Sequence, residues 1–551
     1  MGKKPAVLFI SFIFLCFSFV IQANEPPLLV TPKGILDIES EPIDTSAVES
    51  MVGEVDAQSA EIIQTIHFAG GTSLDLNLLA QDVGFLIGQP YSTDLVQIAI
   101  SRVSERFHAS GFPLAFATVG QHGFSDGKLT ITVVEGYIIR SEVVVDDEAV
   151  KQRIQSILSS VVNQKPARQA SLERAIALIH AIPGYQFSMA LPRPKTRSGA
   201  TSLRVEQKNR EIFEPFVGYS MQQRGDKNMS VGLKANVNQA YLETIQLTGL
   251  IPIDGGDQQY YAAALTHALG YDGWTSRLNL SYYQDKDDTV LVVGGNEVNI
   301  ANRIERQSAN YGLAYPFVLN KNNRVTAELG LLYETEDREY GLSLNDTYLG
   351  ALEDSLRYLI ARLHVNAQLV TDDLAFAFGI GVNRSINGAF HYESDLGQQT
   401  IYDEGMMFYN LDVAASYTMA MRYVLSLRAN GLYANDPIVP SQRVNFGGVN
   451  YGRAYSEGTL EGDRGYGAEL KFMYKSRRKN VYFNPFVLVD YAYAEQVRLV
   501  LPYADTSSAA IGFETGYRQH LHLVFDYATP LLEHDERFSK AVYNLSLRWK
   551  F

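Results

Sequence analysis

Cysteine is almost missing from this chain of 551 residues, because Cys16 is the only one. One thiol cannot close an intrachain disulfide, and it cannot supply the several thiolates of a structural zinc site. Cys16 also lies in an amino-terminal segment that we expect to be removed, so thiolate catalysis is excluded from the mature chain. Stability and function must depend on other chemistry.

Long apolar runs are also scarce. After the first two dozen residues no run approaches the ~18–20 residues of a membrane-spanning helix, which excludes a helical membrane protein. At the amino terminus, Lys3 and Lys4 precede the apolar residues 6–21, and the small Ala23 follows. This pattern predicts a secretory signal peptide over residues 1–23, with an uncleaved anchor helix as the alternative.

Basic residues are outnumbered, with 47 Lys and Arg against 61 Asp and Glu and a formal net charge of −14. Binding to nucleic acid depends on a concentrated basic surface, and no basic block stands out in the sequence. Nucleic acid is therefore excluded as a partner. No ATP-binding motif is present either, so we expect no cofactor.

The chain divides into segments of different texture. Residues 24–58 are acidic and contain four prolines, which predicts a linker without long elements. Two small mixed modules follow, over residues 59–136 and 137–208. Each is predicted to contain a strand, two helices and two further strands in that order.

Residues 209–551 lose the helical period and alternate apolar and polar side chains in segments of about ten residues, a pattern typical of membrane β-barrels. In residues 359–369 the odd positions are apolar, while Arg362 and His364 occupy the other face. A dry interior would bury such charges at a large cost, so we expect lipid outside and a wet lumen inside. Allowing about 21 residues per strand and connection, the segment predicts about 16 antiparallel strands. The predicted fold class is α+β modules followed by an all-β transmembrane barrel.

The final segment alternates up to an aromatic last residue. One face carries five apolar or aromatic side chains: Tyr543, Leu545, Leu547, Trp549 and Phe551. This pattern is similar to the signal by which the barrel-assembly machinery recognises outer-membrane barrels. We expect these residues to serve as an assembly signal, with a chance alternating strand as the alternative.

Short motifs recur through both modules in a fixed order. The first module contains Gly88, Tyr91 and residues 111–112, 126–129 and 134–136; the second contains residues 179–184 and 199–205. Together they resemble the two polypeptide-transport-associated (POTRA) domains of the two-partner secretion transporters, the TpsB family that includes ShlB. The resemblance covers nearly the whole mature chain.

A glycine-rich segment of the barrel, from Phe446 to Tyr466, resembles the sixth extracellular loop of this family, which folds back into the pore. The family's usual motif is Val-Arg-Gly followed by an aromatic residue, whereas here Gly452 and Ala454 flank Arg453. Besides Arg453, the resemblance assigns to this loop motif Gly447, Gly448, Tyr455, Asp463 and Gly465.

The family's loop arginine pairs with an aspartate on the inner barrel wall. The segment that resembles the family's is residues 486–492, which makes Asp490 the matching aspartate. Strand parity supports this assignment independently, because Val487 and Val489 would face lipid and leave Asp490 in the lumen. The family's glycine two residues later is Ala492 here. We expect Arg453 and Asp490 to form an ion pair that holds the loop, and an ordinary wall salt bridge is the alternative.

The resemblance implies a function in type V secretion. The barrel would sit in the outer membrane of a Gram-negative bacterium with its POTRA domains in the periplasm, and would recognise and secrete an unfolded partner exoprotein of the haemolysin or adhesin type. Its expected partners are that exoprotein, outer-membrane lipid and the barrel-assembly machinery. We expect no enzyme activity and no catalytic residues. The alternatives are an outer-membrane protein insertion factor of the same superfamily, a passive porin, and an outer-membrane hydrolase.

Three other patterns have simpler explanations. Residues 123–127 match the nucleophile elbow of hydrolases around Ser125, but they lie between two predicted strands and therefore predict a hairpin turn. His520 and His522 share a face of a predicted strand without a third ligand, so we expect no metal site. The acidic residues 285–288 are interpreted as part of a solvated loop.

Overall fold

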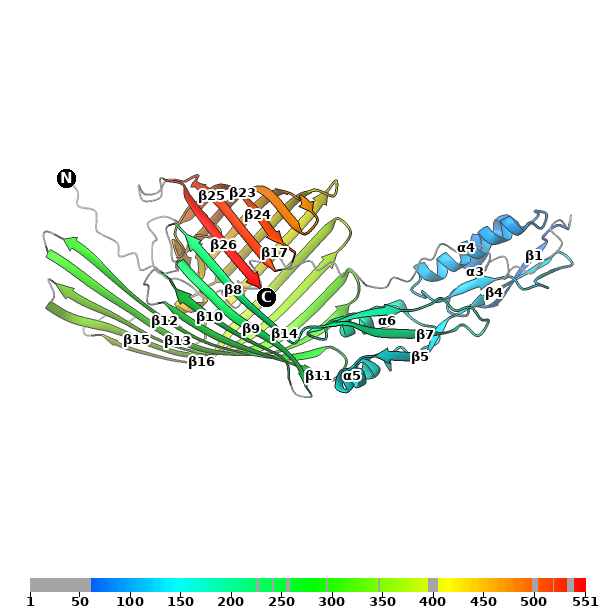
Figure 1. Cartoon of the computed structure of the whole chain (residues 1–551), viewed down its shortest axis with the longest axis horizontal. Coiled ribbons are helices and arrows are strands. Elements are labelled where there is room, and N and C mark those ends of the chain that lie inside the picture. Colours follow the sequence, from blue (N-terminus) through cyan, green and yellow to red (C-terminus); the bar gives the residue numbers. More distant parts are fainter. Residues whose placement is uncertain are drawn as a thin grey trace. The chain divides into compact units, whose positions relative to one another are not determined.

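The computed structural model describes residues 61–551, except 224–226, 240–241, 254–257, 294–295, 345–346, 395–404, 498–503, 519 and 533–539. The predicted signal peptide and linker lie outside the described residues. Contacts divide the chain into two units after Glu211, and each unit is described by itself. Figure 1 shows the α/β modules in blue to cyan and the barrel in green to red.

The first module is a small sheet covered by helices. Its elements are β1 (Thr65–Gly70), α3 (Leu76–Val83), η1 (Gly84–Leu86), α4 (Thr93–Ala109), β2 (Phe116–Thr118), β3 (Phe124–Ser125) and β4 (Lys128–Val134). Strand β4 is central, parallel to β1 and antiparallel to β2 and β3. Helix α4 buries Val96, Ala99, Val103 and Phe107, which recur every three or four residues and so form one stripe.

The turn between β3 and β4 is the predicted hairpin turn. Asp126 and Gly127 both have positive φ, 53° and 70°, as a two-residue hairpin of the I′ type requires. Ser125 therefore precedes a strand rather than a helix, which removes the context of a nucleophile elbow.

The second module repeats this arrangement. Its elements are β5 (Tyr137–Val144), α5 (Glu148–Leu158), α6 (Gln169–His180), β6 (Tyr185–Ala190) and β7 (Ala200–Arg210). Strand β7 lies between β5, which is parallel to it, and β6, which is antiparallel. Asp147 caps α5 by accepting hydrogen bonds from the backbone N–H groups of Ala149 and Val150. The order strand, helix, helix, strand, strand is confirmed in both modules, with β3 as a short addition in the first.

None of the helices that the structure describes is long and apolar enough to cross a bilayer.

The remaining residues form a closed antiparallel barrel. Its strands are β8 (Phe213–Gln222), β9 (Lys227–Gln239), β10 (Leu242–Pro252), β11 (Gln259–Leu269), β12 (Trp274–Val293), β13 (Asn296–Leu319), β14 (Asn323–Leu344), β15 (Thr347–Val370), β16 (Leu374–Ser394), β17 (Met407–Met419), β18 (Tyr423–Ala434), β21 (Arg464–Tyr474), β22 (Arg477–Arg478), β23 (Val481–Glu495), β24 (Asp505–Tyr517), β25 (Leu521–Pro530) and β26 (Val542–Lys550).

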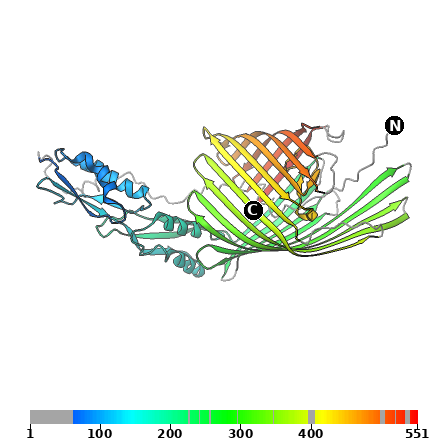
Figure 2. The same cartoon turned by 180° about the vertical axis from the view of Figure 1, so that it is seen from behind.

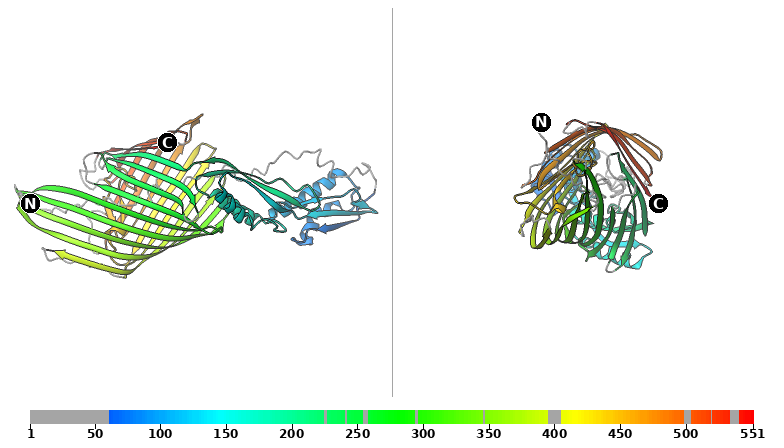
Figure 3. Two further views of the ribbon diagram at one scale, coloured as in Figure 1. Left: turned by 60° about the horizontal axis from the view of Figure 1, so that its bottom comes forward. Right: turned by 90° about the vertical axis from the view of Figure 1, so that its left-hand side faces the viewer.

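Closure occurs where β26 pairs with β8, the first strand of the barrel. The two-residue β22 continues β21 alongside β23, so the described strands occupy sixteen positions, as the sequence predicts. In Figure 1 the red β26 lies next to the green β8, and the end-on view in Figure 3 shows the ring. Figure 2 shows the wall from behind, formed by the middle of the barrel segment in green to yellow.

The outer face of the barrel carries two belts of exposed aromatic side chains. One belt lies towards the short turns and contains Trp274, Phe317, Tyr417, Tyr423, Phe483, Tyr517, Trp549 and Phe551. The other contains Tyr261, Tyr333, Tyr409, Tyr433, Tyr466, Tyr527 and Tyr543. Tyr423 and Tyr433 stand ten residues apart on β18, and a tilted strand of that length spans the apolar band of ~25 Å between aromatic girdles.

Strands β12 to β16 are 20 to 24 residues long, about twice the predicted length. Figures 1 and 3 show them reaching past the ends of the other strands. The exposed ion pair between Arg303 and Glu339, 3.7 Å apart, lies on this extension beyond the tyrosine belt, where charge is not in contact with lipid. The interpretation of residues 285–288 as a loop is therefore wrong, because they lie within β12 and its sheet continues into water.

Candidate functional site

The connection between β18 and β21, residues 435–463, folds into the barrel, and we call it the inner loop. It contains η2 (Pro440–Gln442) and a hairpin of β19 (Val444–Phe446) and β20 (Leu460–Gly462). Its apolar side chains pack against lumen-facing residues of the wall from β14 to β23 and form one buried cluster with them. The inner loop is therefore packed on the wall as a part of the core.

Two glycines shape the tip of the inner loop. Gly447 has φ of 127°, and a Cβ there would lie 2.0 Å from the carbonyl oxygen of Ser456. Gly448 has φ of 59°, and a Cβ there would lie 2.1 Å from the side-chain nitrogen of Gln222 on β8. Backbone atoms obstruct a Cβ at Gly447, and the left-handed conformation at Gly448 favours glycine, so this path brings the loop against itself and against the first barrel strand.

Two tyrosines of the inner loop fill specific places. The Tyr451 ring lies over Gly467 of β21, where a Cβ would come within 2.6 Å of it. Tyr455 is 2% exposed, and its hydroxyl lies 2.5 Å from the carbonyl oxygen of Leu532 and 3.3 Å from that of Ser507. Because these partners belong to the barrel wall and its connections, both rings fix the height of the loop in the barrel.

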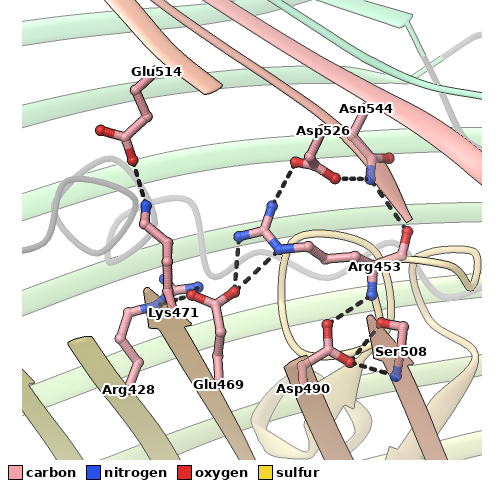
Figure 4. A network of polar contacts seen from close by, with 9 residues as sticks. All are labelled: Arg428, Arg453, Glu469, Lys471, Asp490, Ser508, Glu514, Asp526 and Asn544. Carbon is pink, nitrogen blue, oxygen red and sulfur yellow. Dashed lines mark hydrogen bonds and ion pairs between the residues drawn. The ribbon is translucent and has the colours of Figure 1, made fainter. Parts of the chain in front are cut away.

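The Arg453 side chain connects the inner loop to two strands of the wall. Its Nε and Nη2 both donate to Oε2 of Glu469 on β21, at 3.1 and 2.8 Å, and its Nη1 donates to Oδ2 of Asp526 on β25, at 2.9 Å. The carbonyl oxygen of Arg453 accepts a hydrogen bond from the side-chain amide of Asn544 on β26, at 3.2 Å. Burial alone would lower the pKa of Arg453, but Glu469 and Asp526 outweigh it and raise the pKa. Figure 4 shows the guanidinium between the two carboxylates.

The predicted ion pair between Arg453 and Asp490 is wrong in its chemistry. Asp490 accepts a hydrogen bond from the backbone N–H of Arg453, at 3.2 Å, while the guanidinium reaches Glu469 and Asp526 instead. The reason is geometric: the backbone of Arg453 lies directly over Asp490, and its long side chain extends past that position. Asp490 is nevertheless part of the site, and Ser508 satisfies its other oxygen through N–H and Oγ at 3.1 and 2.6 Å.

Sequence reasoning missed Glu469 and Asp526. The alternation of β21 and β25 places both on the lumen face, so their charge was a usable signal. Their height relative to Arg453 depends on the strand register, which the sequence pattern does not give. Arg428 of β18, also missed, binds the second oxygen of Glu469 at 3.0 Å.

Asp463, the last residue of the inner loop, is 1% exposed and binds both ends of the loop. Its carboxylate accepts hydrogen bonds from Ile438 N at 3.0 Å, from Arg443 Nε at 3.0 Å and from Val497 N at 2.9 Å. The predicted loop residue Gly465 follows at the start of β21, where a Cβ would lie 2.5 Å from the carbonyl oxygen of Tyr493. Asp463 thus joins both ends of the loop to the neighbouring connection after β23.

A second attachment lies on the opposite flank of the inner loop. The buried hydroxyl of Tyr358 on β15 bonds both Glu334 of β14 and Ser441 of the loop. Four residues further along β15, Arg362 donates from Nη2 to Oε1 of Gln442 at 2.8 Å. The loop is therefore held to both flanks of the wall that it covers.

The two departures that place alanine where the family has glycine, Ala454 and Ala492, are accommodated. Ala454 is fully buried in an apolar patch of lumen-facing side chains beside Tyr455, and its φ is not positive. Ala492 is fully buried in the cluster that holds the loop. At each position the methyl group of the alanine packs inside one of these buried apolar clusters.

The remaining predicted residues are on the outer face or in turns. Tyr543, Trp549 and Phe551 are exposed on the outside of the last strand segment, with Leu545 and Leu547 between them. His520 precedes β25 and therefore does not share a strand face with His522. Within the described part of the chain, no group of three or more His, Cys, Asp or Glu side chains could hold a metal ion.

Comparison with known proteins agrees with this architecture. Residues 62–136 match the family model of the ShlB-type POTRA domain, so the first module is a POTRA domain of that type. The structure is similar to CdiB from Escherichia coli, with a TM-score of 0.64 and 15% identity over 92% of this chain and 95% of that one. It is also similar to CdiB from Acinetobacter baumannii, with a TM-score of 0.59 and 14% identity over 91% of each chain. No curated protein sequence matches the chain. The predicted resemblance to the TpsB transporters is confirmed in POTRA type and in fold.

Proposed function

We propose that this chain is the outer-membrane transporter of a two-partner secretion system, which captures an unfolded exoprotein of the haemolysin or adhesin type in the periplasm and passes it outward through the barrel. The observation that carries this proposal is the inner loop, a segment anchored in the lumen of a barrel that follows a ShlB-type POTRA domain. A passive porin has no need of a periplasmic POTRA domain.

The two POTRA-like modules supply the capture surface in this proposal. In the second module β7 is central, so β5 and β6 are the edge strands of the sheet, and on the outer side of β5 a bridge joins Ile138 to Val162. Edge strands can accept an extended peptide as an additional strand, which binds the cargo backbone whatever its side chains are. Such binding suits a long exoprotein that has to stay unfolded before export.

The inner loop and the wall supply the passage. The Arg453 network holds the loop in one position through hydrogen bonds to β21, β23, β25 and β26. We infer that this network keeps the lumen in a defined shape while the exoprotein moves, and that Arg453 and Asp490 act together in that role. Movement would be driven by folding of the cargo outside the cell, with no catalytic chemistry in the chain.

The last strand supports the proposed location and biogenesis. Its aromatic outer face, which ends at Phe551, suits recognition by the barrel-assembly machinery and placement in the outer-membrane lipid. The POTRA modules would then lie in the periplasm, since β8 enters the barrel directly from the second module.

The experiment that tests the function compares secreted proteins from cells with and without this chain. Loss of one large exoprotein from the medium, with other outer-membrane barrels at normal levels, is the expected result. A general fall in other barrels would instead identify an insertion factor. Unchanged secretion, together with a membrane conductance that does not depend on residues 59–208, would identify a porin.

A further inference from the structure

Five residues with small, uncharged side chains form one row across the lumen face of β9 to β13, and we call it the small row. Its members are directly paired from strand to strand: Gly232, Thr248, Ala262, Ser281 and Ser308. Their chain neighbours Leu247, Tyr261 and Leu280 are exposed on the outer face, so strand alternation directs the row into the lumen. All five members of the row are partly exposed.

The wall on the other side of the barrel has the opposite character. There the lumen-facing Asp490, Ala510, Asp526 and Asn544 are at most 7% exposed, because the inner loop lies on them. The contacts described above attach that loop to β14, β15, β18 and the strands from β21 through β26 to β8. Among the residues that the structure describes, strands β9 to β13 are thus the part of the wall to which none of these contacts attaches the inner loop.

Charges flank the small row but do not interrupt it. Lys234 follows Gly232 by two residues on β9, and its ammonium group is paired with Glu214 at 2.9 Å. Towards the extended strands, Arg306 is buried and paired with Glu336 through Nε at 2.5 Å. Within the row, the hydroxyls of Ser281 and Ser308 bond each other at 2.6 Å. Lys234, Arg306 and the two serines of the row are therefore paired with partners within the wall.

We propose that the small row is the surface along which the exoprotein passes as an extended polypeptide, an inference that rests on the proposed secretion function. A moving chain presents every kind of side chain in turn, so a suitable surface needs room and must not bind any of them strongly. Small side chains from Thr248 to Ser308 give room, whereas the ring of Phe216 occupies the space over Gly232 at the β8 end of the row. Weak, uncharged groups release what they contact, as conduction through a pore requires. The charged wall under the inner loop would bind acidic or basic side chains and is already occupied.

The test uses two matched serines as attachment points for a photocrosslinker. Ser281→Cys places a thiol in the small row, and Ser426→Cys places one on the lumen face of β18. Both serines are partly exposed, and each bonds a serine of the next strand, Ser308 and Ser416 respectively. Cys16→Ser in both backgrounds leaves one thiol in the full-length chain, which is labelled with a benzophenone maleimide.

The probe is the exoprotein identified by the secretion comparison, stalled in transit by fusion to a domain that folds before export. The amount of crosslinked product is divided by the fraction of each variant that carries the benzophenone label. We expect this ratio to be several-fold higher with Ser281→Cys than with Ser426→Cys. Equal yields, a higher yield with Ser426→Cys, or no product from either variant would overturn the proposed path. Secretion of the unfused exoprotein is measured in the same strains and in a strain that lacks the chain. Only equal secretion with and without the chain would count against the proposed function.

Discussion

Arg453 and Glu469 are joined by two hydrogen bonds to a single carboxylate oxygen, from Nε at 3.1 Å and from Nη2 at 2.8 Å. The other oxygen of Glu469 is held by Arg428, so one buried acid is shared by two arginines from different segments. An acid that is 4% exposed needs such compensation, because an unpaired charge in this position is strongly unfavourable. The inner loop therefore supplies a cation that the wall requires.

Replacing Arg453 by alanine should release the inner loop. The substitution leaves Glu469 and Asp526 buried with less compensation, and breaking a buried pair in this way costs about 3–5 kcal/mol. We expect secretion of the exoprotein to fall strongly while the barrel still assembles. Secretion is measured in the culture medium and assembly by the heat-dependent mobility of the barrel on gels.

The control for this prediction is Arg453→Lys, which keeps the charge but not the planar fork that reaches two acids. It should retain barrel assembly and recover only part of the secretion. Wild-type secretion by Arg453→Ala would show that the network is not needed for transport.

Neutralising Glu469 should have a larger effect than neutralising Asp490. Glu469 binds the guanidinium, whereas Asp490 accepts only from neutral donors, the N–H of Arg453 and the N–H and Oγ of Ser508. The amide oxygen of asparagine can keep the bond from Arg453, and the bond from the Ser508 N–H is then the one that is lost. We therefore expect Glu469→Gln to reduce secretion more than Asp490→Asn, in parallel assays with equal barrel levels. The reverse order would mean that Asp490 acts through its charge.

A methyl group at Gly447 should prevent the loop tip from closing. The backbone conformation there is nearly closed to other residues, at a cost of about 1–3 kcal/mol before the contact with Ser456 is counted. We expect Gly447→Ala to increase hydrogen exchange in residues 446–456. Gly249→Ala is the matched control, since a Cβ there meets only ordinary contacts at 3.6 Å or more. Equal exchange in both variants would disprove the steric argument.

Removing the hydroxyl of Tyr358 should loosen the second flank of the loop. Tyr358→Phe leaves Glu334 and Ser441 without this partner, a loss of about 1–3 kcal/mol for buried polar groups. We expect faster hydrogen exchange in residues 438–446, with smaller changes around Arg453. Tyr348→Phe, at a position that is 61% exposed, should leave exchange unchanged. If both variants behave alike, the flank does not depend on Tyr358.

The barrel could be predicted from sequence because alternation fixes which face of a strand a residue occupies. This is why Arg362 was placed in the lumen and Tyr543 outside, and both positions are found in the structure. Alternation says nothing of how far a strand continues once it has left the lipid. Residues 285–288 lie on such a continuation, where neither face needs to be apolar, and the sequence therefore suggested a loop.

The candidate site could be predicted in its position but not in its pairing. The resemblance to the family identified Arg453 and Asp490, and they do meet. The partners of the guanidinium come from strands that are distant in sequence, and their alignment depends on the register of the whole sheet. Sequence patterns within single strands carry no information on that register.

Asn544 links the closure of the barrel to the docking of the inner loop. It faces Gln222 across the closing pair of strands, and it also donates to Asp526 and to the carbonyl oxygen of Arg453. Two of the anchors of Arg453 thus belong to the hairpin of β25 and β26, which closes the barrel on β8. The inner loop therefore has its full set of partners only when the sheet is closed.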